Sequence, residues 1–252
     1  KLGKKSYQYY GTNSGFTNFY KKNFKNFIKL DKTKIFFDNG INFNYEKSNR
    51  LIKITQTISG AKILFFGGKL DNKNIIFQSN ISILDENNAI KAPKNYSSTD
   101  VNGLTGCLTF SNLKMEKVSI QARGSTCEDT VNLVNVSGDL DDVNIENSFS
   151  DALDIDFSDV KIKNIFVTNA GNDCVDFSLG KYYVANLNLE KCGDKGISIG
   201  EKSFAKLEEI KVVDVDIGLT SKDSSITIIQ NSLFKNLNTC VSAYNKKQEF
   251  DG

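Results

Sequence analysis

The sequence predicts an all-β protein, a right-handed parallel β-helix whose turns are about 22 residues long. The first observation is a short phrase that recurs between Cys127 and Tyr244, with anchors at Asp129, Asp151, Asp173, Lys195, Ile217 and Thr239. The second is a small residue after each anchor, at Thr130, Ala152, Cys174, Gly196, Gly218 and Cys240. The third is an aliphatic residue after that, at Val131, Leu153, Val175, Ile197, Leu219 and Val241. A fixed repeat with the same chemistry in each column is typical of a solenoid.

Alternation within each repeat predicts strands rather than helices. Leu153 and Ile155 flank Asp154, so the aliphatic side chains should face the core and the carboxylate should face outward. A leucine-rich repeat has a similar length but needs a Leu/Asn consensus and a helix in every repeat, and neither pattern is present here. The single proline of the chain suits long, uninterrupted strand ladders.

Residues 1–33 are expected to form an N-terminal cap. Apolar side chains recur there at helical spacing, opposite several lysines, at Phe19, Tyr20, Phe24, Phe27 and Ile28. A helix on a membrane surface is one interpretation. We favour a helix that plugs the open end of the solenoid, because a terminal turn exposes its apolar core and its strand edges.

Residues 34–252 are expected to form the β-helix itself. Short β-rich runs between residues 34 and 84 are out of register with the repeat and predict irregular early turns. Residues 85–106 are polar and predict a loop. Regular turns should begin at about Cys107, which joins the column of small residues if the preceding turn is one residue longer than the others.

The chain has five cysteines, and those stacked in the column of small residues are expected to be free, small apolar core residues. Cys174 and Cys240 share the column of small residues, where we expect free thiols. Cys127 and Cys192 lie several turns apart, so we expect no bridge between them.

Composition excludes several functional classes. The chain has no histidine, which excludes a Ser-His-Asp triad, a Cys-His pair and a histidine metal site. Its formal net charge of +2 gives no global reason to expect nucleic acid binding. No run of about 18 apolar residues occurs, so we expect no membrane span.

Acidic columns are the strongest functional signal. Equivalent positions in successive turns stack about 4.8 Å apart, so Asp129, Asp151 and Asp173 should form one line that Lys195 continues. Neighbouring columns hold further candidate ligand-binding residues, namely Asp154, Asp176, Asp194 and Asn172, and Lys222 lies in the column of Asp156. Stacked like charges repel, and a cation, a lysine or shared protons must relieve them.

Three uses fit such columns. Paired carboxyl groups can act as general acid and base in glycoside hydrolysis. Asp129, Asp151 and Asp173 can bind Ca²⁺, which would neutralise an acidic sugar while a lysine removes a proton in β-elimination or epimerisation. The columns can also bind sugar hydroxyls along a groove. The structural alternative is that Asp, Asn, Gly and Ser only serve the tight corner before each strand.

The order of motifs SDALDID, GNDCVDFS, DKGISIG and IGLTSKD, over roughly residues 151–223, resembles the polygalacturonase branch of the pectate-lyase-like β-helix proteins. The resemblance implies that Asp151 and Asp173 are catalytic carboxyl groups, with Asn172 in place of a further aspartate. It also implies that Lys195 stands where that family has histidine. Lys222 stands for the family's final lysine, and Thr220 replaces its arginine.

We therefore expect a carbohydrate-active protein that acts on an acidic polysaccharide, as a lyase, an epimerase or a glycoside hydrolase. The expected catalytic residues are Asp151, Asp173, Lys195 and Lys222. The alternative is a noncatalytic carbohydrate-binding or structural surface module of a larger protein, similar to an adhesin or a tailspike. The fold resemblance implies an extracellular, cell-surface or periplasmic location.

Overall fold

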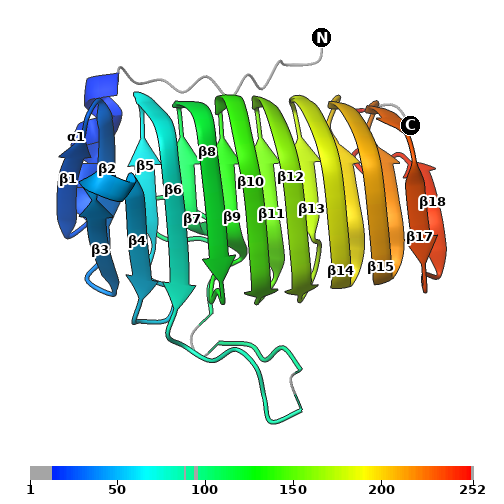
Figure 1. The fold of residues 1–252 in the computed structure, drawn as a ribbon, viewed down its shortest axis with the longest axis horizontal. Helices are drawn as coiled ribbons and strands as arrows, with labels where there is room; N and C mark the ends of the chain where they lie inside the picture. The colour runs from blue at the N-terminus through cyan, green and yellow to red at the C-terminus, as the bar shows by residue number, and fades with distance from the viewer. Residues whose placement is uncertain (1–12, 88, 94–95, 251–252) are drawn as a thin grey trace.

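The computed structural model describes residues 13–87, 89–93 and 96–250. In this part of the chain, one α-helix and eighteen strands are present, and the strands stack into a parallel β-helix of about nine turns (Figure 1). The predicted fold class and the turn length of about 22 residues are confirmed.

The early elements are irregular, as expected. They are α1 (Asn13–Asn23), β1 (Asn26–Leu30), β2 (Thr33–Phe37), β3 (Ile41–Glu46), a short 3-10 helix (Lys47–Asn49), β4 (Leu51–Gln56), β5 (Ile63–Phe66) and β6 (Lys69–Ser79). The pairs β1–β2, β2–β5 and β3–β4 are antiparallel, whereas parallel pairing begins between β4 and β6 and between β5 and β7. The described residues between β6 and β7, 80–87, 89–93 and 96–105, then form a loop that leaves the solenoid (Figure 1), close to the loop predicted at 85–106.

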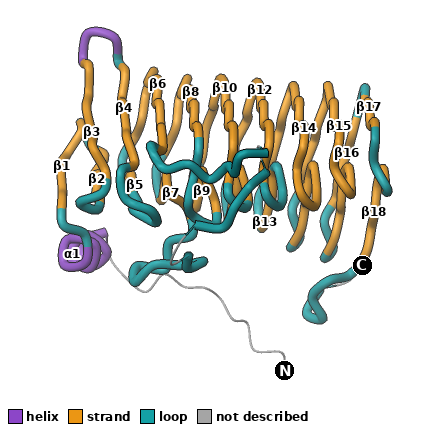
Figure 2. The backbone as a smooth tube through the Cα atoms, turned by 90° about the horizontal axis from the view of Figure 1, so that it is seen from below, coloured by secondary structure: helices purple, strands orange, loops and turns teal. Residues whose placement is uncertain are grey.

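The regular turns follow this loop. Their strands are β7 (Gly106–Ser111), β8 (Lys114–Arg123), β9 (Asp129–Val134), β10 (Ser137–Ser148), β11 (Asp151–Asp156), β12 (Asp159–Ala170), β13 (Val175–Ser178), β14 (Lys181–Gly200), β15 (Phe204–Lys222), β16 (Ile226–Ile229), β17 (Ser232–Lys235) and β18 (Thr239–Tyr244). From β7 to β13, short strands such as β9 and β11 alternate with long bent strands such as β10 and β12, whereas β14 and β15 each run through both positions of a turn (Figure 2).

The strand register reproduces the repeat. Leu153 pairs with Val131 on one side and with Val175 on the other, and all three are fully buried. Gly106 pairs with Asp129, so this turn is one residue longer than its successors and Cys107 does align with the column of small residues. The aliphatic column is therefore the centre of the core, and the polar positions between its members face outward.

The N-terminal helix is confirmed, but it ends before the last apolar residues assigned to it. Phe27 and Ile28 lie in β1, which forms an edge of the sheet beside β2. Tyr20 of α1 and Phe24, the residue that follows the helix, pack against Phe36, which lies on the outer side of β2. The helix therefore covers the flank of the first strands, while Ile28 and other residues of the early strands cover the end of the core.

The opposite end of the core is exposed within the described part of the chain. Ile229, Phe234 and Val241 pair with the buried residues Leu207, Val212 and Leu219, yet Val241 is 50% exposed and the other two are only partly buried. They belong to β16, β17 and β18, which pair with β15 on one side. No helix of the described residues is long and apolar enough to cross a membrane.

The expectation of free thiols was wrong for Cys107 and Cys174, whereas Cys127 and Cys192 are not joined to each other, as expected. Disulfides join Cys107 to Cys127 and Cys174 to Cys192, with Cα atoms 5.4 and 5.5 Å apart. The chain brings Cys127 and Cys192, which lie 20 and 18 residues after their partners, back beside Cys107 and Cys174. Positions within the repeat did not reveal this approach. Cys240 is free but exposed, because it lies in the last described turn.

Candidate functional site

The predicted acidic columns lie close together: Asp154 and Asp176 face outward between buried aliphatic residues, whereas Asp129 and Asp173 are buried at or just before the start of a strand. We call this surface the Asp–Lys face and define it by Asp129, Asp151, Asp154, Asp156, Asp173, Asp176, Lys195 and Lys222. Parallel pairing aligns Asp129 with Asp151, Asp154 with Asp176, and Asp176 with Ser198. The predicted catalytic residues therefore come from successive turns of one sheet, and the fold holds them at fixed spacing.

A chain of hydrogen bonds links Asp151, Asp173 and Lys195 from one turn to the next. Asp151 Oδ1 accepts hydrogen bonds from the backbone N–H of Asp173 at 2.8 Å and from Asn172 Nδ2 at 2.7 Å. Asp173 Oδ1 accepts from the backbone N–H of Lys195 at 3.0 Å and lies 3.4 Å from Lys195 Nζ. Lys195 Nζ also pairs with Asp194. Four predicted site residues and the predicted partner Asn172 thus form one connected group.

Lys222 belongs to a second group one column away. Its Nζ donates to Ser198 Oγ at 2.7 Å and lies 4.0 Å from Asp176 Oδ2. Asp154 accepts a hydrogen bond from Asn132 Nδ2 at 3.0 Å. The Lys222 side chain is only 6% exposed, so its ammonium group is fixed against the sheet rather than mobile in solvent.

Burial and mutual repulsion raise the pKa values of these carboxyl groups. Burial, together with repulsion from neighbouring carboxylates, raises the pKa of Asp129 to about 8, that of Asp151 to about 7 and that of Asp156 to about 6. Burial also raises the pKa of Asp154 well above its usual value. Several members of the face therefore carry protons near neutral pH.

Asp173 has a different environment from Asp151. Burial raises the pKa of Asp173, but the positive charge of Lys195 opposes this effect. Burial lowers the pKa of Lys195, whereas its hydrogen bond to Asp194 and the charge of Asp173 raise it, and the pKa is raised overall. Lys195 is therefore an ammonium ion paired with a carboxylate, which is a poor arrangement for a proton-abstracting base.

The aspartates do not converge on a common point. In the described residues, no group of three or more His, Cys, Asp and Glu side chains is placed to hold a metal ion. Asp151 and Asp173 each accept hydrogen bonds from the next turn, which directs their oxygens along the stack rather than toward one centre. Asp129 Oδ2 and Asp176 Oδ1 are buried acceptors without a hydrogen bond in this part of the protein. The calcium site at Asp129, Asp151 and Asp173 stays a prediction that this geometry does not favour.

Two residues of the site were not among the expected ones. Asp156 lies in the acidic cluster, and its place in the repeat was a usable signal. Lys62 is 3% exposed, donates from Nζ to the backbone oxygen of Thr105 at 2.8 Å and interacts electrostatically with Asp129. Nothing in the repeat pointed to Lys62, because it lies in an early turn outside the 22-residue register.

No protein-family model, curated protein or solved structure matches this chain. The resemblance to polygalacturonases therefore depends on the short motifs alone. The arrangement of the side chains places Asp151, whose pKa is raised to about 7, beside Asp173, which is paired with Lys195, and it holds Lys195 and Lys222 in fixed positions.

Proposed function

We propose that the protein hydrolyses glycosidic bonds of an acidic polysaccharide on the Asp–Lys face. The observation that carries this proposal is the different environment of two adjacent carboxyl groups, Asp151 and Asp173. Glycoside hydrolysis needs one carboxyl group that keeps its proton and a second that is ionised. With its pKa raised to about 7, Asp151 suits the general acid. The ion pair with Lys195 favours the carboxylate of Asp173, which suits the base or nucleophile.

The two lysines determine which sugars the face accepts. Lys195 and Lys222 provide positive charge that can hold the carboxylate of an acidic sugar, and protonation of neighbouring aspartates reduces its repulsion. Hydrolysis fits better than β-elimination, because Lys195 is held in its charged form by Asp194 and Asp173. The two buried disulfides are typical of oxidising compartments, which supports a role outside the cytoplasm.

The test is incubation with polygalacturonate, alginate and a set of neutral polysaccharides, with reducing ends and unsaturated products measured separately. We expect new reducing ends without unsaturated products. Asp151→Asn and Asp173→Asn should each lower the rate by about 100-fold or more while the thermal unfolding transition remains. Asp159→Asn is the matched control, since Asp159 is an exposed aspartate at the start of β12.

Other outcomes would redirect or reject the proposal. Full activity in both site variants would remove the Asp–Lys face as the active site. Unsaturated products would assign a lyase reaction, and binding of a polysaccharide without any product would favour the noncatalytic module.

A further inference from the structure

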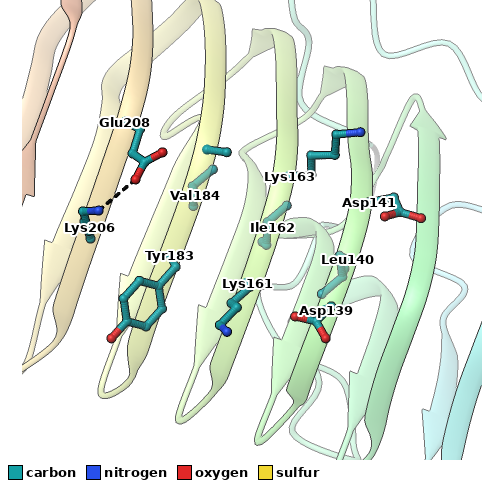
Figure 3. Close-up of a pocket in the computed structure, with 11 residues that line it drawn as sticks. Asp139, Leu140, Asp141, Lys161, Ile162, Lys163, Tyr183, Val184, Lys206 and Glu208 are labelled. Carbon is teal, nitrogen blue, oxygen red and sulfur yellow. Dashed lines mark hydrogen bonds and ion pairs between the residues drawn. The ribbon is translucent and has the colours of Figure 1, made fainter.

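Two shallow hollows lie on the long bent strands. One hollow of about 330 Å³ is lined by residues of β10, β12, β14 and β15 (Figure 3), and a second of about 520 Å³ is lined by residues of β12, β14, β15 and β17. Lys163 lines the first hollow and the next residue, Asn164, lines the second, so the two hollows lie on either side of one bend. We call the combined surface the bend groove and define it by Asp139, Asp141, Lys161, Lys163, Asn164, Phe166, Tyr183, Asn186, Lys206, Glu208, Glu209, Lys211, Asn231 and Leu233.

The bend groove has a local cause in the strands. The alternation of inward and outward side chains is interrupted once in each long strand, where two consecutive residues both face outward. In β12, Lys163 and Asn164 lie between the buried residues Ile162 and Ile165. The same interruption recurs in β10, β14 and β15, and stacking of these interruptions extends the hollow along the solenoid axis.

Two aromatic side chains lie exposed in the groove. Tyr183 is 37% exposed and Phe166 is 39% exposed, one on each side of the bend. The Tyr183 ring lies on β14, in a row with Lys161 and Asp139 of the two preceding turns (Figure 3), and contacts Phe204 at a ring-centre distance of 5.9 Å. Exposed rings inside a concave polar surface are typical of ligand-binding surfaces, because they offer flat apolar area beside hydrogen-bonding groups.

Amide side chains supply repeated hydrogen-bonding groups at the bend. Asn186 Nδ2 donates to Asn164 Oδ1 at 2.9 Å, and Asn164 Nδ2 donates to Asp142 Oδ1 at 2.7 Å. Each carboxamide has two N–H donors and an oxygen with two acceptor sites, so each keeps hydrogen-bonding capacity after these contacts. The groups recur about every 4.8 Å along the axis, which suits a ligand that is itself a repeating polymer.

Charge in the groove is balanced, unlike charge on the Asp–Lys face. Its lysines, Lys161, Lys163, Lys206 and Lys211, alternate with acidic residues, Asp139, Asp141, Glu208 and Glu209. Lys206 Nζ donates a hydrogen bond to Glu208 Oε1 at 2.8 Å and forms an ion pair with it. A surface of this kind has no net attraction for a strongly charged polymer.

We propose that the bend groove binds a neutral polysaccharide, a polymer different from the acidic one proposed for the Asp–Lys face. Sugar rings would lie on Tyr183 and Phe166, and their hydroxyl groups would bond to the amides and charged groups at the bend. This binding needs no catalysis on the other face. In a wall or matrix of mixed composition, it would hold the protein on one polymer while the Asp–Lys face acts on another.

The test is depletion of the full chain from solution by insoluble cellulose, mannan and xylan, with polygalacturonate as the acidic comparison. We expect binding to at least one neutral polymer, with little dependence on salt concentration. Tyr183→Ala and Phe166→Ala should each weaken that binding by about tenfold. Phe19→Ala removes a ring of similar exposure from α1 and should leave binding unchanged.

The test separates this proposal from the proposed function. Asp151→Asn should bind the neutral polymer as the unsubstituted protein does, whatever its activity. Absence of binding to all three neutral polymers, or unchanged binding in both groove variants, would overturn the proposal. A change of molar mass by light scattering in Tyr183→Ala would also overturn it, because the groove would then be a protein contact.

Discussion

The Asp–Lys face and the bend groove are built from the same repeat but have opposite electrostatic character. On the short strands, like charges stack directly above one another: Asp151 helps to raise the pKa of Asp129, and Asp173 helps to raise that of Asp151. On the long strands, Asp139, Lys161, Tyr183 and Lys206 occupy one column, so unlike groups are neighbours. Stacking in columns therefore does not cause repulsion by itself. The acidic columns carry an unfavourable electrostatic energy that is absent from the bend groove.

Of the substitutions that test this contrast, loss of Lys195 should change the free energy of unfolding most. Lys195→Met leaves Asp173, whose side chain is 5% exposed, without its partner charge. We expect the free energy of unfolding to fall by about 3 kcal/mol near pH 8. The loss should be smaller near pH 5, where Asp173 can take up a proton. Chemical denaturation at both pH values measures this effect.

Lys163→Met in the bend groove is the matched control. Lys163 is exposed, and its loss should change stability by no more than about 0.5 kcal/mol. Equal losses for the two lysines would remove the proposed difference between the faces.

The pH dependence of stability should follow the acidic columns. A carboxyl group whose pKa is raised by folding binds its proton more tightly in the native state, so its stabilising effect is complete at low pH and is lost as pH rises through the native pKa. With native values of about 6 to 8 for Asp156, Asp151 and Asp129, stability should decrease by at least about 2 kcal/mol from pH 5 to pH 8. Thermal and urea unfolding across this range give the curve. A rise in stability over the same interval would contradict it.

Removal of one central ionisable group should stabilise the protein. Burial is the main cause of the raised pKa of Asp154, and the nearby carboxyl groups of Asp129, Asp156 and Asp176 also raise it. Asp154→Asn should raise the free energy of unfolding by about 1 kcal/mol near pH 8. Asp141→Asn in the bend groove, at the same pH, should have little effect. A destabilised Asp154→Asn would indicate that its hydrogen bond from Asn132 outweighs the repulsion.

Added Ca²⁺ should have the smallest effect on stability. Since the described carboxyl groups form no metal-binding cluster, added Ca²⁺ should raise the melting temperature no more than Mg²⁺ at the same ionic strength. A Ca²⁺-specific rise that grows with concentration would show binding to the native state. Its loss in Asp151→Asn would then restore the calcium site that the sequence predicted.

Much of the candidate site was predictable from the repeat. A 22-residue period and a parallel strand register together place Asp151, Asp173 and Lys195 one above another, because each turn repeats the path of the last. The partners Asn172 and Asp194 followed from the same register. Lys62 could not be found in this way, since its position depends on how an irregular early turn meets the first regular one.

The sequence by itself determined the solenoid, its turn length, the aliphatic core column and the residues that share the Asp–Lys face. Each of these follows from local alternation and a fixed period. Only the tertiary structure decided the contacts between turns: the disulfides at Cys107 and Cys174, the flank position of α1 and the hollow along the bends. Those features depend on the rotation and bending of whole turns relative to one another, and a one-dimensional pattern carries no information about either.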